Sequence, residues 1–261
     1  MKKKIEIEIN KILYDKTSGS NDLLSNIHAL LFRNSTDLCE LKFIIHQLKK
    51  AFPTFSGIQN YLYNFERTIN RKDSIRKFFQ DFNHTKKSVY DDIFKNALPY
   101  LKKKKNILTI SNSKTVFEIL TRLASFTKLS IFICESRPKY EGRILAEKLA
   151  DRKIKTHLIT EAQAATYLGK SDCVLIGADS ILKNGDAINK IGSFQLAILC
   201  KYFNQPFYLI ADKLKFSSNN KFIQAEISSG EIWNVSKKRI KIKNFYFERI
   251  PKSLITKIIT N

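Results

Sequence analysis

Short apolar runs alternate with amphipathic segments over residues 106–210 of the chain. The apolar runs, which we expect to be strands, are Ile107–Ile110, Ser130–Cys134, Thr156–Ile159, Cys173–Ile176 and Phe207–Ile210. The segments between them have the apolar spacing of helices and are Ser113–Phe126, Tyr140–Ala150, Glu161–Leu168 and Ser193–Phe203. Strands that alternate with such helices form right-handed βαβ units. The sequence therefore predicts a Rossmann-like α/β domain with a doubly wound, mostly parallel sheet.

The chain before residue 106 has the spacing of helices only. Its apolar residues recur at intervals of three and four, which places them on one face of each helix. The expected helices are Asn21–Arg33, Thr36–Phe52, Phe55–Ile69 and Asp73–Lys105. The last one carries an aromatic stripe with Phe78, Phe79 and Phe82, which is typical of a buried core. We therefore expect a helical domain over residues 1–105 and the α/β domain over residues 106–261.

The chain is strongly basic, with 46 Lys and Arg residues against 24 Asp and Glu residues and a formal net charge of +22. Clustered Lys and Arg bind phosphate backbones, so RNA or the ribosome is a candidate partner. The alternative is a solvated, Lys-rich surface. We favour the alternative because the basic runs are dispersed, at Lys2–Lys4, Lys102–Lys105 and Lys237–Lys243, and because Lys far exceeds Arg.

Neither a membrane span nor an export signal is expected. No apolar run approaches the roughly 20 residues that cross a bilayer, and the N-terminal residues MKKKIEIEIN lack the continuous apolar core of a signal peptide. The cysteines Cys39, Cys134, Cys173 and Cys200 are far apart and form no C-x-x-C motif. We interpret them as reduced, mostly buried thiols of a cytoplasmic protein, and we expect no metal and no other cofactor.

The turn after the first predicted strand, ISNSKT (110–115), can hold a phosphate. Ligands of doubly wound sheets bind beyond the carboxyl ends of the strands, where turns lead into helices. The hydroxyls of Ser113 and Thr115, the ammonium of Lys114 and the backbone amides at a helix N-terminus would converge on the anion. A Ser-capped helix with a solvent-facing Lys114 is an equally good interpretation.

The turn after the second predicted strand, CESRPKYEGR (134–143), is rich in charge. The Arg137 and Arg143 side chains can hold a phosphate or a carboxylate through two parallel hydrogen bonds. An internal lattice of Glu and Arg is the alternative, and we favour it for Glu141 with Arg143 because neighbours on a helix often pair.

The most unusual segment is GADSILKNGDAINKIGS (177–193), in which Asn184-Gly185-Asp186 predicts a tight turn. Asp179 follows a predicted strand, and Asn189 and Lys190 precede a predicted helix. An acid in this place can move protons on a bound sugar while Lys190 holds an anion. Alternatively, Asp179 caps a turn and Lys190 neutralises it.

Together these segments resemble a known superfamily. ESRPKYEGR, GADSILKNGDAINKIGSFQLAILCKYFNQPFYLIADKLKF and IKIKNFYFERIPKSLITKIIT are similar to the alpha, beta and delta subunits of translation initiation factor 2B. The same superfamily includes aldose-phosphate isomerases that act on methylthioribose 1-phosphate or ribose 1,5-bisphosphate. The match covers about residues 106–261, whereas the N-terminal half shares only its helical character and the segment Ser18-Gly19-Ser20.

The resemblance implies roles for particular residues. Asp179 falls on the catalytic Asp of the isomerases, and the catalytic Cys falls on Ser111, which carries a hydroxyl instead of a thiol. A Ser hydroxyl without an adjacent base hardly ionises, and Cys134 is a less favoured source of a thiol. The implied ligand-binding residues are Ser18, Gly19, Ser20, Ser113, Lys114, Thr115, Asn189, Lys190 and Lys215.

The loss of the thiol with retention of the other positions implies a function. We expect an initiation factor 2B-related protein that binds a ribose-like sugar phosphate or a nucleotide with little or no catalysis. The alternative is an aldose-ketose isomerase acting on ribose 1,5-bisphosphate or methylthioribose 1-phosphate. The resemblance also implies a homodimer or larger homo-oligomer formed through the C-terminal domain, and a translation factor is a further candidate partner.

Overall fold

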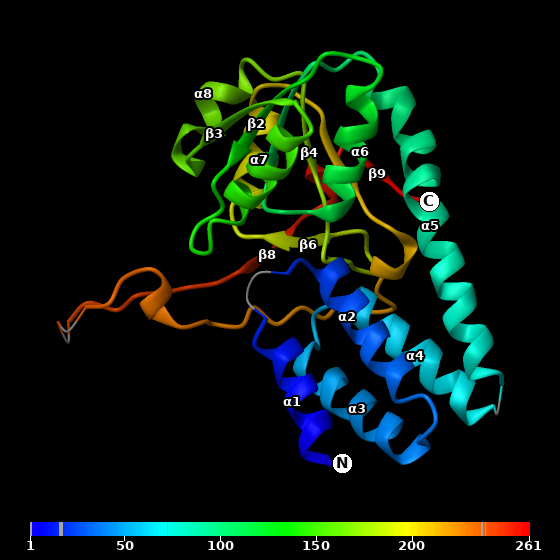
Figure 1. Ribbon diagram of the computed structural model, residues 1–261. Coiled ribbons are helices and arrows are strands. Elements are labelled where there is room, and N and C mark those ends of the chain that lie inside the picture. The colour runs from blue at the N-terminus through cyan, green and yellow to red at the C-terminus, as the bar shows by residue number, and fades with distance from the viewer. Residues whose placement is uncertain (1, 16–17, 72, 236, 238) are drawn as a thin grey trace.

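The computed structural model describes residues 2–15, 18–71, 73–235, 237 and 239–261 (Figure 1). The N-terminal part is built from α1 (Lys2–Leu13), α2 (Ser20–Arg33), α3 (Leu38–Ala51), α4 (Ser56–Asn70) and α5 (Ile75–Leu101). In Figure 1, α1 to α4 gather at one end of the molecule, and α5 runs along its side to the sheet. Each predicted helix of this part is present with ends shifted by a few residues.

The α/β part confirms the predicted fold class. Its elements in chain order are β1 (Asn106–Ile110), α6 (Lys114–Ala124), β2 (Ser130–Cys134), α7 (Glu141–Asp151), β3 (Lys155–Ile159), α8 (Ala164–Leu168), β4 (Cys173–Ile176), α9 (Ser193–Tyr202), β7 (Phe207–Ile210) and β9 (Lys257–Ile259). The sheet order is β3-β2-β1-β4-β7-β9, and every neighbouring pair runs parallel. The order reverses between β1 and β4, which is where doubly wound sheets bind ligands.

A second, smaller sheet was not predicted. It consists of β5 (Ser180–Ile181), β6 (Ala187–Lys190) and β8 (Phe247–Ile250) in the order β5-β6-β8, with antiparallel pairs. The predicted tight turn joins β5 to β6, and Gly185 adopts the left-handed region there, with φ at 89°. Asn189 and Lys190 therefore lie in a strand, where the pairing of β6 with the distant β8 fixes them.

The helical part has an aromatic core of its own. Tyr61, Phe65 and Phe79 are almost completely buried among the aliphatic side chains of α1 to α4. The helix α1 was missed because the alternation of Ile and Glu in its first residues has the period of a strand. In the structure Ile5, Ile9 and Ile12 are buried at helical spacing.

The long helix α5 belongs to two cores. Its N-terminal half contributes Phe79 to the helical core, and its C-terminal half contributes Ile93, Ala97 and Leu101 to the core on one face of the sheet. This shared helix ties the two parts together. The domain boundary that we propose after residue 105 thus lies just beyond it.

Between Phe216 and Phe247 the chain leaves the body as a long arm, orange in Figure 1. An antiparallel bridge between Glu226 and Phe245 joins its two limbs near the body, and Ile227 N donates to Asn244 O at 2.9 Å beside it. Within the described part of the chain, no helix combines the length and the apolar character needed to cross a bilayer.

Candidate functional site

A cavity of about 580 Å³ is lined by residues from the helical part, the sheet and the arm. It is lined by all the residues to which the resemblance assigned a catalytic or ligand-binding role. These are Ser18, Gly19, Ser20, Ser111, Ser113, Lys114, Thr115, Asp179, Asn189, Lys190 and Lys215. The carboxyl ends of β1 and β4 reach this cavity, as expected for the point at which the strand order reverses.

Lys215 lies at one end of the cavity and is only 4% exposed. Its ammonium donates a hydrogen bond to the Ser20 hydroxyl at the start of α2. Its stem lies against Gly57, where a Cβ atom would come within 3.3 Å of the Lys215 Cδ atom. Among the described residues, no carboxylate lies within ion-pair distance of this ammonium. Lys215 is thus a buried cation that no carboxylate in the described part of the chain neutralises.

The N-terminus of α2 is open to a ligand, whereas two other helices near the cavity are closed. Within residues 2–15 and 18–71, no side-chain cap hydrogen bond is present at the first turn of α2, whose N-cap residue is Gly19. In contrast, the Ser113 hydroxyl accepts from Val116 N in the first turn of α6, and the Glu248 carboxylate accepts from Phe194 N in α9. The backbone amides at the start of α2 can therefore hold an anion beside Lys215.

The turn after β1 is held in a strained conformation. Ser111 has φ at 70°, and its backbone N–H donates to Ser136 Oγ at 2.8 Å. The adjacent Ser113 packs so closely on Gly177 that a Cβ atom there would lie 2.4 Å from Ser113 Oγ. Lys114 is not a free cation, because its ammonium lies 3.4 Å from the Asp22 carboxylate. The turn can therefore bind a ligand mainly through its hydroxyl and amide groups rather than through a net charge.

Asp179 and Asn189 occupy the middle of the lining. Asp179 is half-buried and its backbone N–H donates to Ile188 O at 2.9 Å, which starts the small antiparallel sheet. Its carboxylate has no hydrogen-bond or ionic partner within the described part of the chain. The Asn189 amide donates to Ser193 Oγ at 2.9 Å and is buried. Both side chains suit the hydroxyls of a sugar.

Lys190 pairs with a carboxylate that we had assigned to another partner. Its side chain is 2% exposed, and Nζ lies 2.8 Å from Glu141 Oε1. The predicted pair of Glu141 with Arg143 is wrong, because residues two apart on a helix point in different directions. Arg143 instead pairs with Glu135 at 2.9 Å. The interpretation in which Lys190 neutralises Asp179 is wrong as well, because Lys190 pairs with Glu141.

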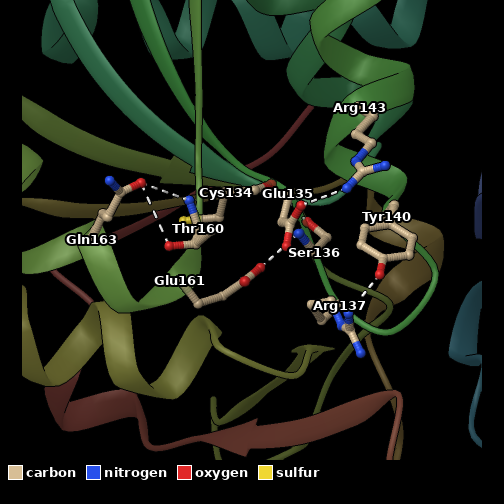
Figure 2. Close-up of polar contacts among 9 residues, drawn as sticks. All are labelled: Cys134, Glu135, Ser136, Arg137, Tyr140, Arg143, Thr160, Glu161 and Gln163. Atoms are coloured by element: carbon tan, nitrogen blue, oxygen red, sulfur yellow. Dashed lines mark hydrogen bonds and ion pairs between the residues drawn. The ribbon is translucent and has the colours of Figure 1, made fainter. Parts of the chain in front are cut away.

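The charged turn after β2 forms a lattice rather than a phosphate clamp (Figure 2). Arg143 lies over the Tyr140 ring at 3.9 Å, and the exposed Arg137 donates to the Tyr140 hydroxyl at 2.5 Å. Nearby, Ser136 donates through its N–H to Glu161 Oε1 at 2.6 Å and through its hydroxyl to Cys134 O at 2.9 Å. Ser136 also accepts the hydrogen bond from Ser111 N, so this lattice fixes the turn that contains Ser111.

Cys134 does not supply a reactive thiol. It lies at the end of β2, is completely buried, and is not among the residues that line the cavity. Burial, together with the nearby Glu161 carboxylate, raises the pKa of the Cys134 thiol to about 12. Thiolate is therefore nearly absent near neutral pH.

This environment predicts the thiol reactivity of the folded protein. Cys39 is exposed, whereas Cys134, Cys173 and Cys200 are buried. At pH 8 we expect a thiol-specific disulfide reagent to modify Cys39 rapidly and the other three only after unfolding. Rapid modification of two or more thiols in the native protein, counted by mass spectrometry, would contradict this picture.

Sequence reasoning missed part of the lining. Tyr246, Glu231 and Lys139 also line the cavity, and Lys139 Nζ lies 4.1 Å and Lys190 Nζ 5.3 Å from the centre of the Tyr246 ring. Tyr246 donates its hydroxyl hydrogen bond to Glu231. Tyr246 and Glu231 lie on the arm, and no local pattern shows that the arm returns to the cavity.

Comparison with known proteins identifies the family. Residues 15–261 match the Initiation factor 2 subunit family, so the chain belongs to it. A ribose 1,5-bisphosphate isomerase from Archaeoglobus fulgidus is 26% identical over 236 residues, covering 85% of this chain and 74% of that protein. A methylthioribose-1-phosphate isomerase from Bacillus cereus is 35% identical over 185 residues, covering 63% of this chain and 52% of that protein.

Solved structures share the fold. The translation initiation factor eIF-2B of Pyrococcus horikoshii superposes with a TM-score of 0.85 at 22% identity, covering 98% of this chain and 94% of that one. A chain of the tetrameric eIF2B-beta2-delta2 complex from C. thermophilum gives a TM-score of 0.73 at 17% identity, covering 98% and 88%. Relatives of this chain thus include sugar-phosphate isomerases, and a chain of a tetrameric complex shares its fold.

Proposed function

We propose that the chain binds a ribose-like sugar phosphate or a nucleotide in this cavity and converts it slowly or not at all. The observation that carries the proposal is Lys215, a buried ammonium without a carboxylate partner among the described residues. An unpaired buried charge is costly. A phosphate beside Lys215, Ser20 and the open N-terminus of α2 would offset that cost.

The middle of the cavity suits the sugar. The free carboxylate of Asp179 accepts hydrogen bonds from hydroxyls, and the Asn189 amide both donates and accepts them. Such groups fix the orientation of a ligand whose phosphate is already held at the other end.

Two features support binding with little catalysis. The resemblance to the isomerases places Ser111 at the position of their catalytic Cys. No histidine is among the described residues that line the cavity. Among the described lining residues, the hydroxyl therefore has no imidazole that could act as its base. The thiol of Cys134 has a raised pKa and is not among the residues that line the cavity.

The second candidate is an aldose-ketose isomerase, and the free carboxylate of Asp179 is the observation that favours it. A carboxylate aimed at a sugar can move the protons that such a reaction requires. This candidate predicts turnover of ribose 1,5-bisphosphate or methylthioribose 1-phosphate that disappears in Asp179→Asn.

One experiment separates the two candidates. We would measure thermal shifts with ribose 5-phosphate, nucleoside monophosphates and the two isomerase substrates, and then analyse the products at high enzyme concentration. We expect a ligand that stabilises the protein and is recovered unchanged. Conversion to a ketose by the wild type and not by Asp179→Asn would establish the isomerase instead, and the absence of any shift would refute both candidates.

We also propose that the chain forms a homo-oligomer through its α/β part. Ile250 and Ile259 near the chain end are buried in the chain's own core and do not provide the surface. Exposed apolar side chains on and after α9, Ile198, Tyr202 and Phe203, support the proposal. Light scattering at low protein concentration should give a mass above 30.3 kDa, and a monomer mass would refute it.

A further inference from the structure

We infer that Glu141 makes the Lys190 end of the cavity electrically neutral, so that the cavity selects ligands with one phosphate and rejects bisphosphates. The inference rests on the proposed function, because it assumes a sugar phosphate in this cavity. It adds a specificity-determining residue and narrows the ligand class to ribose-like monophosphates.

The first step is the ion pair itself. Lys190 Nζ lies 2.8 Å from Glu141 Oε1, and the two side chains are 2% and 18% exposed. Water does not screen a pair that is buried to this degree, so the attraction between the charges is strong. Lys190 is therefore already neutralised before a ligand arrives, in contrast to Lys215.

The second step concerns the other oxygen of Glu141. Glu141 Oε2 is buried and has no hydrogen-bond partner among the described residues. A buried acceptor without a donor carries a penalty that a ligand hydroxyl would relieve. A phosphate would add a charge of about −1.5 to −2 and further acceptor oxygens at neutral pH. This end of the cavity is thus suited to a hydroxyl and repels a second phosphate.

The other charged side chains beside Tyr246 do not change the net charge at the Lys190 end of the cavity. Lys139 and Glu231 also line the cavity beside Tyr246, and they contribute one positive and one negative charge. With Lys190 and Glu141, the four groups sum to zero. At the other end, Lys215 has no carboxylate within ion-pair distance among the described residues, and the amides of α2 lie beside it. The Asp15 carboxylate also lines this part of the cavity and accepts a hydrogen bond from Ser18 N at 2.9 Å.

The test compares two ligands on three proteins. Isothermal titration would measure ribose 5-phosphate and ribose 1,5-bisphosphate against the wild type, Glu141→Gln and Glu118→Gln. Glu118 is the matched control, because it is also partly buried and paired, with Arg122 at 2.7 Å, and does not line the cavity. Thermal melting would show that each variant is folded.

We expect the wild type and Glu118→Gln to bind the monophosphate at least about tenfold more tightly than the bisphosphate, a difference of about 1.4 kcal/mol. Glu141→Gln frees Lys190 and should bind the bisphosphate at least about tenfold more tightly than the wild type does. Its monophosphate affinity should change little, because Lys215 is intact.

Each failure has its own meaning. A wild type that binds ribose 5-phosphate but binds the bisphosphate equally well or better would overturn this inference and leave the proposed function standing. An unchanged preference in folded Glu141→Gln would also overturn it. If neither ligand binds any of the proteins, the proposed function itself is wrong. The ratio of the wild-type affinities for the two ligands tests the inference even if Glu141→Gln does not fold.

Discussion

Replacing Lys215 with Met is expected to stabilise the ligand-free protein while removing its ability to bind ribose 5-phosphate. Lys215 is 4% exposed, and its ammonium has no carboxylate partner among the described residues. An apolar side chain of similar length should therefore stabilise the folded, ligand-free protein by about 1 kcal/mol or more. A hydrogen bond to a charged group contributes about 1.5–3 kcal/mol. Affinity for the phosphate should therefore fall at least about tenfold.

Thermal melting with and without ribose 5-phosphate measures both effects. The matched control is Lys201→Met, because Lys201 is exposed near the end of α9 and does not line the cavity. This control should keep the wild-type melting temperature and ligand response. A Lys215→Met protein that melts at a lower temperature and still responds fully to the ligand would show that Lys215 has a purely structural role.

Gly142→Ala is expected to cause the largest loss of stability in the part of the chain that supports the site. A Cβ atom at Gly142 would lie 1.9 Å from the Cys134 carbonyl oxygen and 2.9 Å from its carbon. These are backbone atoms at the end of a central strand, so they cannot rotate away. Either α7 moves off the sheet or β2 bends, and we expect a loss of about 3 kcal/mol or more.

Gly169→Ala is the control for this substitution. Its Cβ atom would have its nearest neighbour 4.0 Å away, and the backbone there is already helical. We expect a change within about 0.5 kcal/mol, with any gain arising from the less flexible unfolded chain. Urea denaturation measures both variants. Similar stability of the two would mean that α7 does not approach β2 as closely as described.

The large-scale organisation could be predicted because it rests on repeated local signals. Most strands of the parallel sheet are buried apolar runs, and five of its six strands were predicted within about one residue of their ends. The last strand, β9, lies in a segment whose apolar residues suit either a strand or a helix. Only its pairing with β7 decides between these. The helix α1 was missed for a similar reason.

The candidate site could be predicted as a set of residues but not as a pattern of charges. Turns at the carboxyl ends of parallel strands must meet, so Ser113 and Asp179 were expected to share a site. The partner of Glu141 was not predictable in this way. Tyr140 adopts φ at 59°, so the helix begins at Glu141, and the carboxylate turns toward Lys190 on the distant strand β6.

That difference changes the chemistry inferred for the site. From sequence, Lys190 and Lys215 were equivalent anion-binding residues. In the structure one of them is neutralised and the other is not. Because burial and pairing decide the effect of a charge, tertiary contacts rather than residue types determine where a phosphate would bind.

The most direct test of the account is isothermal titration of the wild-type protein with ribose 5-phosphate, followed by recovery of the ligand and its analysis by NMR. The account predicts saturable binding with a Kd below about 1 mM and a ligand that is recovered unchanged after prolonged incubation. Conversion of the sugar, or no heat of binding at millimolar ligand, would contradict it.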